Sequence, residues 1–250
     1  MRFCVCIKQV PDVTAPIQVR DGHLVMDAGR VVLNAYDASA VEAALVLTEA
    51  HGGTVDVLLI GPERASETVR KALAMGADAG VHLVVPEGTE LDSAAVAALL
   101  ADALAGGGYD AILTGKQAQD TDSGLAGAML AERLGLPYVT NAVGLAQEGD
   151  TLLVTRQGDA GQEMIAAPAP CLVTCSNDMN DPRIPGIKGV MASKKKPVDV
   201  RPVGGAPAVQ VRTLGFEAIP DRPAGRTLDG EAAEVAGQAV RLLHDEARAL

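Results

Sequence analysis

Aromatic side chains are scarce in this chain, whose 250 residues include no tryptophan, three tyrosines and two phenylalanines. Surfaces that bind single-stranded nucleic acid stack the bases on aromatic rings, so the composition argues against such a surface. Positive charge is also in deficit, because 21 Lys and Arg residues stand against 32 Asp and Glu residues, a formal net charge of −11. This balance disfavours general binding to nucleic acid or to anionic membranes.

Long apolar runs are missing as well. None approaches the roughly 20 residues of a transmembrane helix, and Met1–Val5 enters an apolar strand pattern at once, without the layout of a signal peptide. We therefore expect a cytoplasmic protein with no membrane insertion. The length allows one sizeable core, or one core with an appendage.

The sequence also lacks the usual metal-binding patterns. Its four cysteines fall in two pairs, Cys4 with Cys6 and Cys171 with Cys175, and its four histidines are scattered without H-x-x-x-H or H-E-x-x-H spacing. Each cysteine belongs to an apolar run rather than to the C-x-x-C turn of a zinc site. A site built from both pairs is conceivable, but we interpret all four as small core residues. No metal ligand and no catalytic residue is predicted.

Apolar runs typical of buried strands alternate with amphipathic runs typical of helices through the first half of the chain. This succession predicts an α/β fold, with a Rossmann-like, mostly parallel sheet and helices on both faces. The strands are expected at residues 3–7, 54–60, 81–85 and 111–114, and the helices at residues 38–50, 65–75, 93–105 and 125–134.

Local signals add detail to this pattern. Residues 17–25 are expected to form a hairpin around Asp21-Gly22. Ser39 and Glu42 have the spacing of a capping box at the start of the first helix. Asp92 or Ser93 is expected to cap the third helix.

After Tyr138 the pattern changes to shorter strands and then to a tail. Residues 177–196 hold prolines and glycines among polar residues and end in a basic run. Residues 197–207 are rich in Pro and Gly and are not expected to be regular for long. A tail of about 50 residues is too thin to form its own core, so we expect it to pack on its own domain or on a partner. The strands are expected at residues 139–145, 152–156, 164–167 and 171–175, and a last amphipathic helix carries Val235, Ala239, Leu242 and Leu243 on one side.

The segment Gly115–Gly124 is the most informative for function. It is polar, bears glycine at both ends, and joins the strand at 111–114 to the helix at 125–134. Backbone N–H groups at the start of a helix are unpaired and favour an anion. Ligands of α/β proteins bind at the carboxyl ends of strands where the strand order reverses, so this loop could share one crevice with residues 8–12, 34–37 and 60–62.

The loop does not predict nucleotide hydrolysis. It lacks the Gly-Lys-Ser/Thr ending of a P-loop. Asp120 and Asp122 would repel a phosphate if both pointed toward it, so we expect them to cap the following helix or to face water. Lys116 is equally compatible with a phosphate contact and with a solvent-exposed position. Lys8 is compatible with a nucleotide contact and with a position at the edge of the core.

Several motifs occur in a specific order along the chain. Together they resemble the beta subunit of an electron-transfer flavoprotein, from residue 1 to about residue 197, whereas the tail beyond matches only in position and character. The motifs are Cys6–Asp12, Leu33–Asp37 followed by Ala40–Ala44, Ala72–Asp78, Gly115–Ala118, Asn180–Arg183 and Met191–Lys196.

This resemblance implies a nucleotide-binding α/β domain at residues 1–190 and a C-terminal extension at residues 191–250 that packs on an alpha subunit. It implies an electron carrier rather than an enzyme. FAD would be held mainly by the alpha subunit and a structural AMP by this subunit, with a second FAD replacing AMP in the electron-bifurcating branch. Flavin dehydrogenases, such as acyl-CoA dehydrogenases, would donate the electrons and a quinone-linked oxidoreductase would accept them.

The resemblance also implies roles for individual residues. Backbone N–H groups of Ser123, Gly124 and Leu125 would bind the phosphate, and Asn34, or backbone near Cys6 and Ile60, would read the adenine edge. The full nucleotide set is Cys6, Asn34, Ala35, Tyr36, Asp37, Ile60, Gly115, Lys116, Gln117, Ala118, Asp120, Thr121, Asp122, Ser123, Gly124, Leu125 and Ala126.

A second group of residues is implied to contact proteins. Pro182–Lys196 corresponds to the family's partner-recognition loop, with Ile187 as its apolar anchor and Met191, Lys194 and Lys195 beside it. Val13 takes the place of the family's flavin-facing aromatic residue, which weakens a stacking role there. Glu163 corresponds to the hairpin acid that influences how the FAD domain sits.

Two alternatives stay open. The chain could be a bifurcating-type subunit with a second FAD, although Ser123–Gly127 departs from the Ala-Gln-Val-Gly of that branch. It could also be a stand-alone nucleotide-binding enzyme, such as an adenylate-transferring ligase. The sequence offers no catalytic base and no Ser-Gly-Gly pyrophosphate loop to support this second alternative.

Overall fold

The structure, a computed structural model, describes residues 1–25, 29–205, 207–220, 222 and 224–249. Contacts divide the chain into one compact unit at Met1–Phe216 and a second at Glu217–Leu250. This division lies beyond residue 190, where the sequence analysis places the domain boundary. The reason is that Val198–Pro202 forms a strand, β13, that pairs with the sheet of the first unit.

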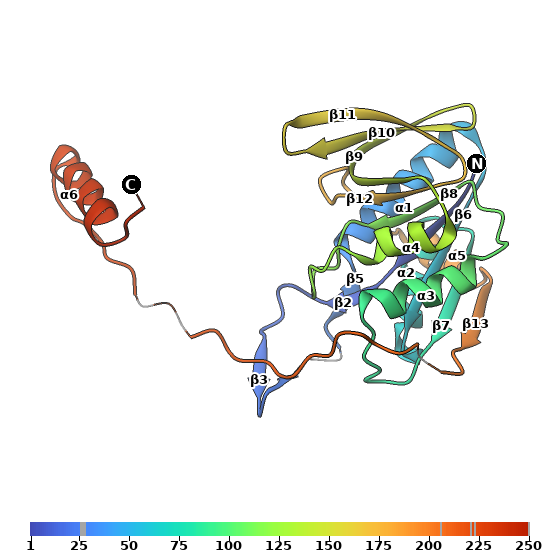
Figure 1. Cartoon of the computed structure of the whole chain (residues 1–250), viewed down its shortest axis with the longest axis horizontal. Helices are drawn as coiled ribbons and strands as arrows, with labels where there is room; N and C mark the ends of the chain where they lie inside the picture. The colour runs from blue at the N-terminus through green and yellow to red at the C-terminus, as the bar shows by residue number, and fades with distance from the viewer. Residues whose placement is uncertain (26–28, 206, 221, 223, 250) are drawn as a thin grey trace. The chain divides into compact units, whose positions relative to one another are not determined.

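A nine-stranded sheet forms the centre of the first unit (Figure 1). Seven neighbouring strands run parallel, and the outermost of them at one edge continues into two further antiparallel strands. The order is β11-β10-β9-β12-β8-β1-β6-β7-β13, with β1 (Arg2–Ile7), β6 (Thr54–Gly61), β7 (Ala79–Val84), β8 (Ala111–Gly115), β9 (Tyr138–Glu148), β10 (Thr151–Gly158), β11 (Gly161–Pro168) and β12 (Cys171–Cys175).

Helices cover both faces of this sheet, and the predicted α/β class is confirmed. Two small strand pairs lie outside the sheet, and one of them is the hairpin predicted around Asp21-Gly22. The helices are α1 (Ala35–His51), α2 (Ser66–Met75) after a short 3-10 turn (Glu63–Ala65), α3 (Ser93–Leu104), α4 (Ala126–Leu134), α5 (Ile187–Ser193) and α6 (Ala232–Asp245), and the small pairs are β2 (Gln9–Pro11) with β5 (Val31–Leu33) and β3 (Gln18–Arg20) with β4 (His23–Val25).

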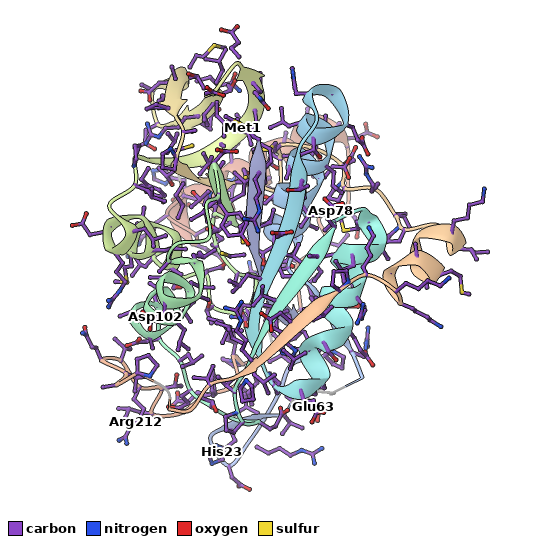
Figure 2. All side chains as sticks on the ribbon, turned by 90° about the vertical axis from the view of Figure 1, so that its right-hand side faces the viewer. Met1, His23, Glu63, Asp78, Asp102 and Arg212 are labelled. Atoms are coloured by element: carbon purple, nitrogen blue, oxygen red, sulfur yellow. The ribbon has the colours of Figure 1, made fainter. Side chains whose placement is uncertain are left out.

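The strand order reverses beside β1. After β1 the chain forms β6 and β7 on one side of it, and β8 then begins on its other side. Figure 2 shows Met1 and Asp78, which precede β1 and β7, at one end of the sheet, and Glu63, which follows β6, at the other. The carboxyl ends of β1 and β8 therefore form the point at which α/β proteins bind ligands.

Alternate side chains of β1 belong to two separate cores. Phe3, Val5 and Ile7 pack in a cluster with residues of α1 and α2. Cys4 and Cys6 pack in the other cluster, with residues of α3 and α4. This alternation is what a strand buried on both faces requires.

The cysteines occupy the core positions predicted for them. All four are buried and free, and Cys171 and Cys175 belong to the same cluster as Phe3. Burial raises the pKa of the Cys171 thiol to about 11. Within the described ranges, no group of three or more His, Cys, Asp or Glu side chains is placed to hold a metal ion.

The start of α1 differs from the prediction. α1 begins at Ala35 instead of residue 38, and its N-cap is Asn34, without a side-chain capping bond. Ser39 and Glu42 are buried inside the helix, so the predicted capping box is wrong. Glu42 binds Arg183 instead, a partner 141 residues away. Asp92 does cap α3, by accepting a hydrogen bond from the Ala95 N–H at 2.8 Å.

The second unit contains α6, whose predicted amphipathic character is clear. None of its residues is buried, and Val240 and Leu243 on it are exposed. Across the described part of the chain, no helix has the length and apolar character needed to cross a membrane.

Candidate functional site

Asp37 joins the ends of β1 and β8 at the point where the strand order reverses. Its Oδ2 accepts a hydrogen bond from the Lys8 N–H at 2.7 Å, and its Oδ1 accepts one from the Gly115 N–H at 2.9 Å. A side chain on Gly115 would collide with Oδ1, so this close approach requires glycine. Burial raises the pKa of Asp37 to about 7, against the opposing effect of hydrogen bonds that include these two. Asp37 therefore fixes the backbone at the carboxyl ends of β1 and β8.

Asn34 binds the polar loop between β8 and α4. Its Nδ2 donates to the Gln117 carbonyl at 2.9 Å, and its Oδ1 accepts from the Gln119 N–H at 3.2 Å. Gln119 reciprocates, because its Oε1 accepts from the Ala35 N–H at 3.3 Å. Asn34 is buried, and both ends of its amide contact the loop. The start of α1 thus holds the loop in place.

The two aspartates of the loop form other contacts than the predicted cap. Asp120 accepts two hydrogen bonds from Lys8 Nζ, at 2.7 and 2.8 Å, and Asp122 accepts one from Gln117 Nε2 at 2.9 Å. The N-cap of α4 is Leu125, without a side-chain capping bond. Of the two predicted alternatives, the capping role is wrong, because Lys8, directly after β1, and Gln117 within the loop bind these carboxylates. Both aspartates are exposed, which agrees with the other alternative, that they face water. The Lys8 ammonium also offsets the charge of Asp120, which reduces repulsion of a phosphate.

The start of α4 offers donors that no protein group uses. Within the described residues, the N–H groups of Ser123, Gly124 and Leu125 donate no hydrogen bond. Gly127 brings the helix close to the sheet, since a Cβ there would lie 2.5 Å from Thr174 Cγ2 and 3.1 Å from Thr114 Oγ1. Free N–H groups at a helix start fit a phosphate, and the helix dipole adds to the attraction.

The other predicted nucleotide residues line the same strand ends. Cys6 lies on β1 with its side chain buried toward α3 and α4, and Ile60 is half-buried near the end of β6. Lys116 is half-buried and donates its N–H to the Cys175 carbonyl. The structure gathers β1, β8, α1 and the loop into one site, and the adenine contacts stay a prediction. Tyr36 and Ala118 are half-buried, Thr121 is exposed and Ala126 is the first residue of α4.

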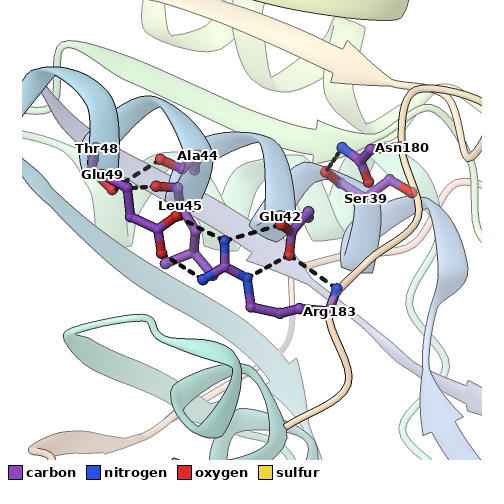
Figure 3. A network of polar contacts seen from close by, with 8 residues as sticks. All are labelled: Ser39, Glu42, Ala44, Leu45, Thr48, Glu49, Asn180 and Arg183. Atoms are coloured by element: carbon purple, nitrogen blue, oxygen red, sulfur yellow. Dashed lines mark hydrogen bonds and ion pairs between the residues drawn. The ribbon is translucent and has the colours of Figure 1, made fainter.

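The predicted partner-recognition segment is held by the network in Figure 3. The Arg183 guanidinium lies between Glu42 and Glu49 of α1, with Nε 2.8 Å from Glu42 Oε2 and Nη2 3.0 Å from Glu49 Oε2. Asn180 Nδ2 donates to the Ser39 carbonyl at 3.0 Å. These contacts join the segment to α1.

Contacts with α2 hold the other end of the same segment. Lys196 Nζ donates to the carbonyls of Gly76 at 2.9 Å and Ala77 at 2.6 Å, at the C-terminal end of α2, where a cation is favoured. Arg70 Nη1 donates to the Ser193 carbonyl at 2.6 Å. Gly189 packs directly on the Ala74 carbonyl, with no room for a side chain. The sequence analysis missed these roles, because all the contacts are distant in sequence.

The segment therefore presents its apolar side chains on a fixed support. Ile187 is 85% exposed and Met191 59% exposed, and both lie on α5. Lys194 and Lys195 are exposed beside them, in contrast to Lys196. The structure brings the predicted docking residues together, and their role as a docking surface stays a prediction.

Val13 and Glu163 lie on separate elements. Val13 is exposed in the loop after β2, and Glu163 on β11 accepts a hydrogen bond from Arg156 Nη1 of β10 at 2.8 Å. Two clefts lie elsewhere and were not predicted. One, of about 590 Å³, opens beyond β6, β7 and β13 at Pro62–Arg64, Val84–Glu87 and Pro202–Val203. The other, of about 330 Å³, lies between α2 and α5.

Comparisons with known proteins agree with this arrangement. A family model described as the electron transfer flavoprotein domain matches residues 23–205. The chain is similar to electron transfer flavoprotein subunit beta of Syntrophomonas wolfei, with 35% identity over 92% of this chain and 91% of the relative. It is 32% identical to the subunit beta of Bacillus subtilis over the whole of both chains. It is also 37% identical to caffeyl-CoA reductase-Etf complex subunit CarD of Acetobacterium woodii, over 80% of this chain and 78% of the relative. The chain belongs to the electron transfer flavoprotein family and is one of its beta subunits.

Proposed function

We propose that this chain pairs with an alpha subunit and holds AMP as a structural ligand at the carboxyl ends of β1 and β8, beside the start of α4. The observation that carries the proposal is the set of unused N–H groups of Ser123, Gly124 and Leu125 at the start of α4. A flavin held mainly by the alpha subunit supplies the redox chemistry when bound. The chain itself supplies no acid, base or nucleophile in this proposal.

Each side chain around the crevice has a positioning role. The three N–H groups donate to the phosphate, while Asn34 holds the loop and Asp37 holds the ends of β1 and β8. Lys8 pairs with Asp120 and so reduces the negative potential near the phosphate. The site is built to bind and orient a ligand, which suits a structural nucleotide.

The electron donors in this proposal are flavin dehydrogenases, such as acyl-CoA dehydrogenases, and the acceptor is a quinone-linked oxidoreductase. The surface formed by Ile187, Met191, Lys194 and Lys195 would dock the donor. An exposed aliphatic side chain beside lysines favours a partner with an apolar pocket and acidic or neutral neighbours.

A second candidate function has its own support. The chain is 35% identical to acryloyl-CoA reductase electron transfer subunit gamma of Anaerotignum propionicum, over 88% of this chain and 85% of the relative. The names of this relative and of the caffeyl-CoA reductase-Etf subunit both refer to a reductase. They favour the alternative that this chain belongs to a carrier that serves a reductase complex. In this candidate, of the bifurcating type, a second FAD occupies the crevice in place of AMP.

The nucleotide content of the purified heterodimer separates these candidates. We expect one FAD per heterodimer, from the visible spectrum, and one AMP among the nucleotides released by denaturation. Two FAD per heterodimer would favour the second candidate. A colourless monomer that turns over ATP would contradict both and favour a stand-alone adenylate-transferring enzyme.

Ile187→Ala is expected to slow electron uptake from the dehydrogenase while flavin content stays unchanged. Truncation of an apolar interface anchor costs about 1–2 kcal/mol, so the apparent affinity should fall roughly 5- to 30-fold. The measurement is the rate of flavin reduction as a function of dehydrogenase concentration. Ile17→Ala is the matched control, because Ile17 is 83% exposed and lies outside the segment Pro182–Lys196. Equal loss of flavin and activity would contradict the docking role.

A further inference from the structure

The short helix α5 has few apolar contacts with the rest of the α/β unit. All seven of its residues are described, and Ser193 alone is buried, whereas Ile187, Val190 and Met191 are exposed. A cleft of about 330 Å³ lies between α2 and α5, and Ala74 and Val190 are among its lining residues. Burial of apolar surface therefore contributes little to the orientation of α5.

The Lys196 ammonium attaches the end of this segment to α2 instead. Its Nζ donates to three carbonyl oxygens, those of Leu73 at 3.1 Å, Gly76 at 2.9 Å and Ala77 at 2.6 Å. An ammonium group has three N–H donors, so all three are used. The acceptors lie at the C-terminal end of α2, where carbonyl groups without helical partners and the helix dipole favour a cation.

The backbone around Lys196 is fixed as well. Arg70 Nη1, on α2, donates to the carbonyls of Ser193 at 2.6 Å and of Lys196 at 2.8 Å. The Pro197 carbonyl accepts a hydrogen bond from the Gly80 N–H of β7 at 3.0 Å. The end of α5 is therefore held by polar contacts at both the side chain and the backbone of Lys196.

The three consecutive lysines of this segment have different surroundings. Lys194 and Lys195 are exposed, whereas Lys196 is half-buried against α2. Since Lys194 and Lys195 face solvent, they are available to a partner, and Lys196 is committed to the fold. A cation with all its donors on one helix end has a geometric role and not one of long-range attraction.

We propose that Lys196 is a positioning residue for electron uptake, because its ammonium orients α5 on α2 and thereby fixes the direction in which Ile187 faces the electron donor. This inference rests on the proposed function. A helix that is held in one orientation before the encounter loses less conformational entropy when the donor docks. The contact of Lys196 with α2 therefore strengthens docking without a contact between Lys196 and the donor.

Lys196→Met tests this role, because methionine keeps an unbranched side chain but has no N–H donor. We expect the half-saturating dehydrogenase concentration for flavin reduction to rise about tenfold, while the maximal rate and the flavin content stay unchanged. The amide exchange rate of Val190, whose N–H donates to the Gly186 carbonyl at 3.0 Å, should rise more than about tenfold. Lys196→Arg should restore part of both quantities, because a guanidinium also donates to carbonyl groups.

Two comparison variants separate orientation from charge. Lys195→Met removes the same charge from an exposed position of the same segment, and the Val190 amide should exchange at the wild-type rate. Arg133→Met removes one positive charge from an exposed position near the end of α4, and both the half-saturating concentration and the exchange rate should stay unchanged.

Three results in Lys196→Met would overturn the inference. These are an unchanged exchange rate, faster exchange with an unchanged half-saturating concentration, and a loss of flavin or of maximal rate as large as the change in that concentration. The last would show a general structural role. Failure of the proposed docking role is recognised separately, because Ile187→Ala would then leave electron uptake unchanged.

Discussion

Gly127→Ala is expected to weaken retention of AMP by the purified heterodimer about fivefold or more. The added Cβ would lie 2.5 Å from Thr174 Cγ2, so the first turn of α4 must move away from β8 and β12. Such overpacking costs about 1–3 kcal/mol. In a helix with free space around the glycine, the same substitution increases stability by roughly 0.5–1 kcal/mol, because alanine favours the helix more than glycine does. A loss of stability in Gly127→Ala would therefore be due to the close packing on the sheet. The measurements are the nucleotide released on denaturation and the melting temperature.

Gly237→Ala is the control for this prediction. Gly237 is also helical, but a Cβ there would meet only the end of the Arg241 side chain, at 3.9 Å. It should leave nucleotide content and melting temperature unchanged or slightly improved. Full nucleotide retention by Gly127→Ala would show that the start of α4 does not hold the phosphate.

Arg183→Met is expected to lower the free energy of unfolding by about 2–3 kcal/mol. The Glu42 side chain is only 10% exposed, and its carboxylate accepts three hydrogen bonds from Arg183. Loss of the guanidinium leaves the buried Glu42 carboxylate with the Arg183 backbone N–H, now that of Met, as its one remaining donor of the three. The effect is smaller than the roughly 3–5 kcal/mol of a fully buried pair, because Arg183 itself is 34% exposed. Urea unfolding of the isolated chain provides the measurement.

Glu49→Gln provides a contrast for Arg183→Met. The Glu49 side chain is 57% exposed, so its pairing with Arg183 contributes at most about 1 kcal/mol. A double-mutant cycle of Arg183→Met with Glu42→Gln should show a coupling energy well above this. A coupling near zero would mean that the network in Figure 3 does not stabilise the segment at Pro182–Lys196.

The sequence predicted the central strands and the polar loop between β8 and α4 because their signals are local. Ala111–Gly115 and Cys171–Cys175 are buried on both faces and therefore read as continuous apolar runs. β13 was missed because Val198–Pro202 is an edge strand that is largely exposed and ends in proline. α5 was missed because a seven-residue helix supports too few turns for a periodic pattern.

Long-range polar contacts escaped prediction for a different reason. The pairing of Lys8 with Asp120 joins residues 112 positions apart, and Asp92 accepts a hydrogen bond from the Gln210 N–H across 118 positions. Residue type alone does not specify such a partner. α1 was predicted to begin too late because Asn34, its N-cap, uses its side chain on the loop and makes no capping bond.

The central position of β1 has a consequence for synthesis of the protein. β1 leaves the ribosome before its partners β6 and β8, which begin only at Thr54 and Ala111. At roughly 5–20 residues per second, a nascent chain needs about 5–20 seconds to translate the second partner. Five of the six residues of this strand are buried in the finished sheet, so they are exposed during that interval. The amino-terminal strand is therefore the segment for which we expect chaperones to matter most during translation.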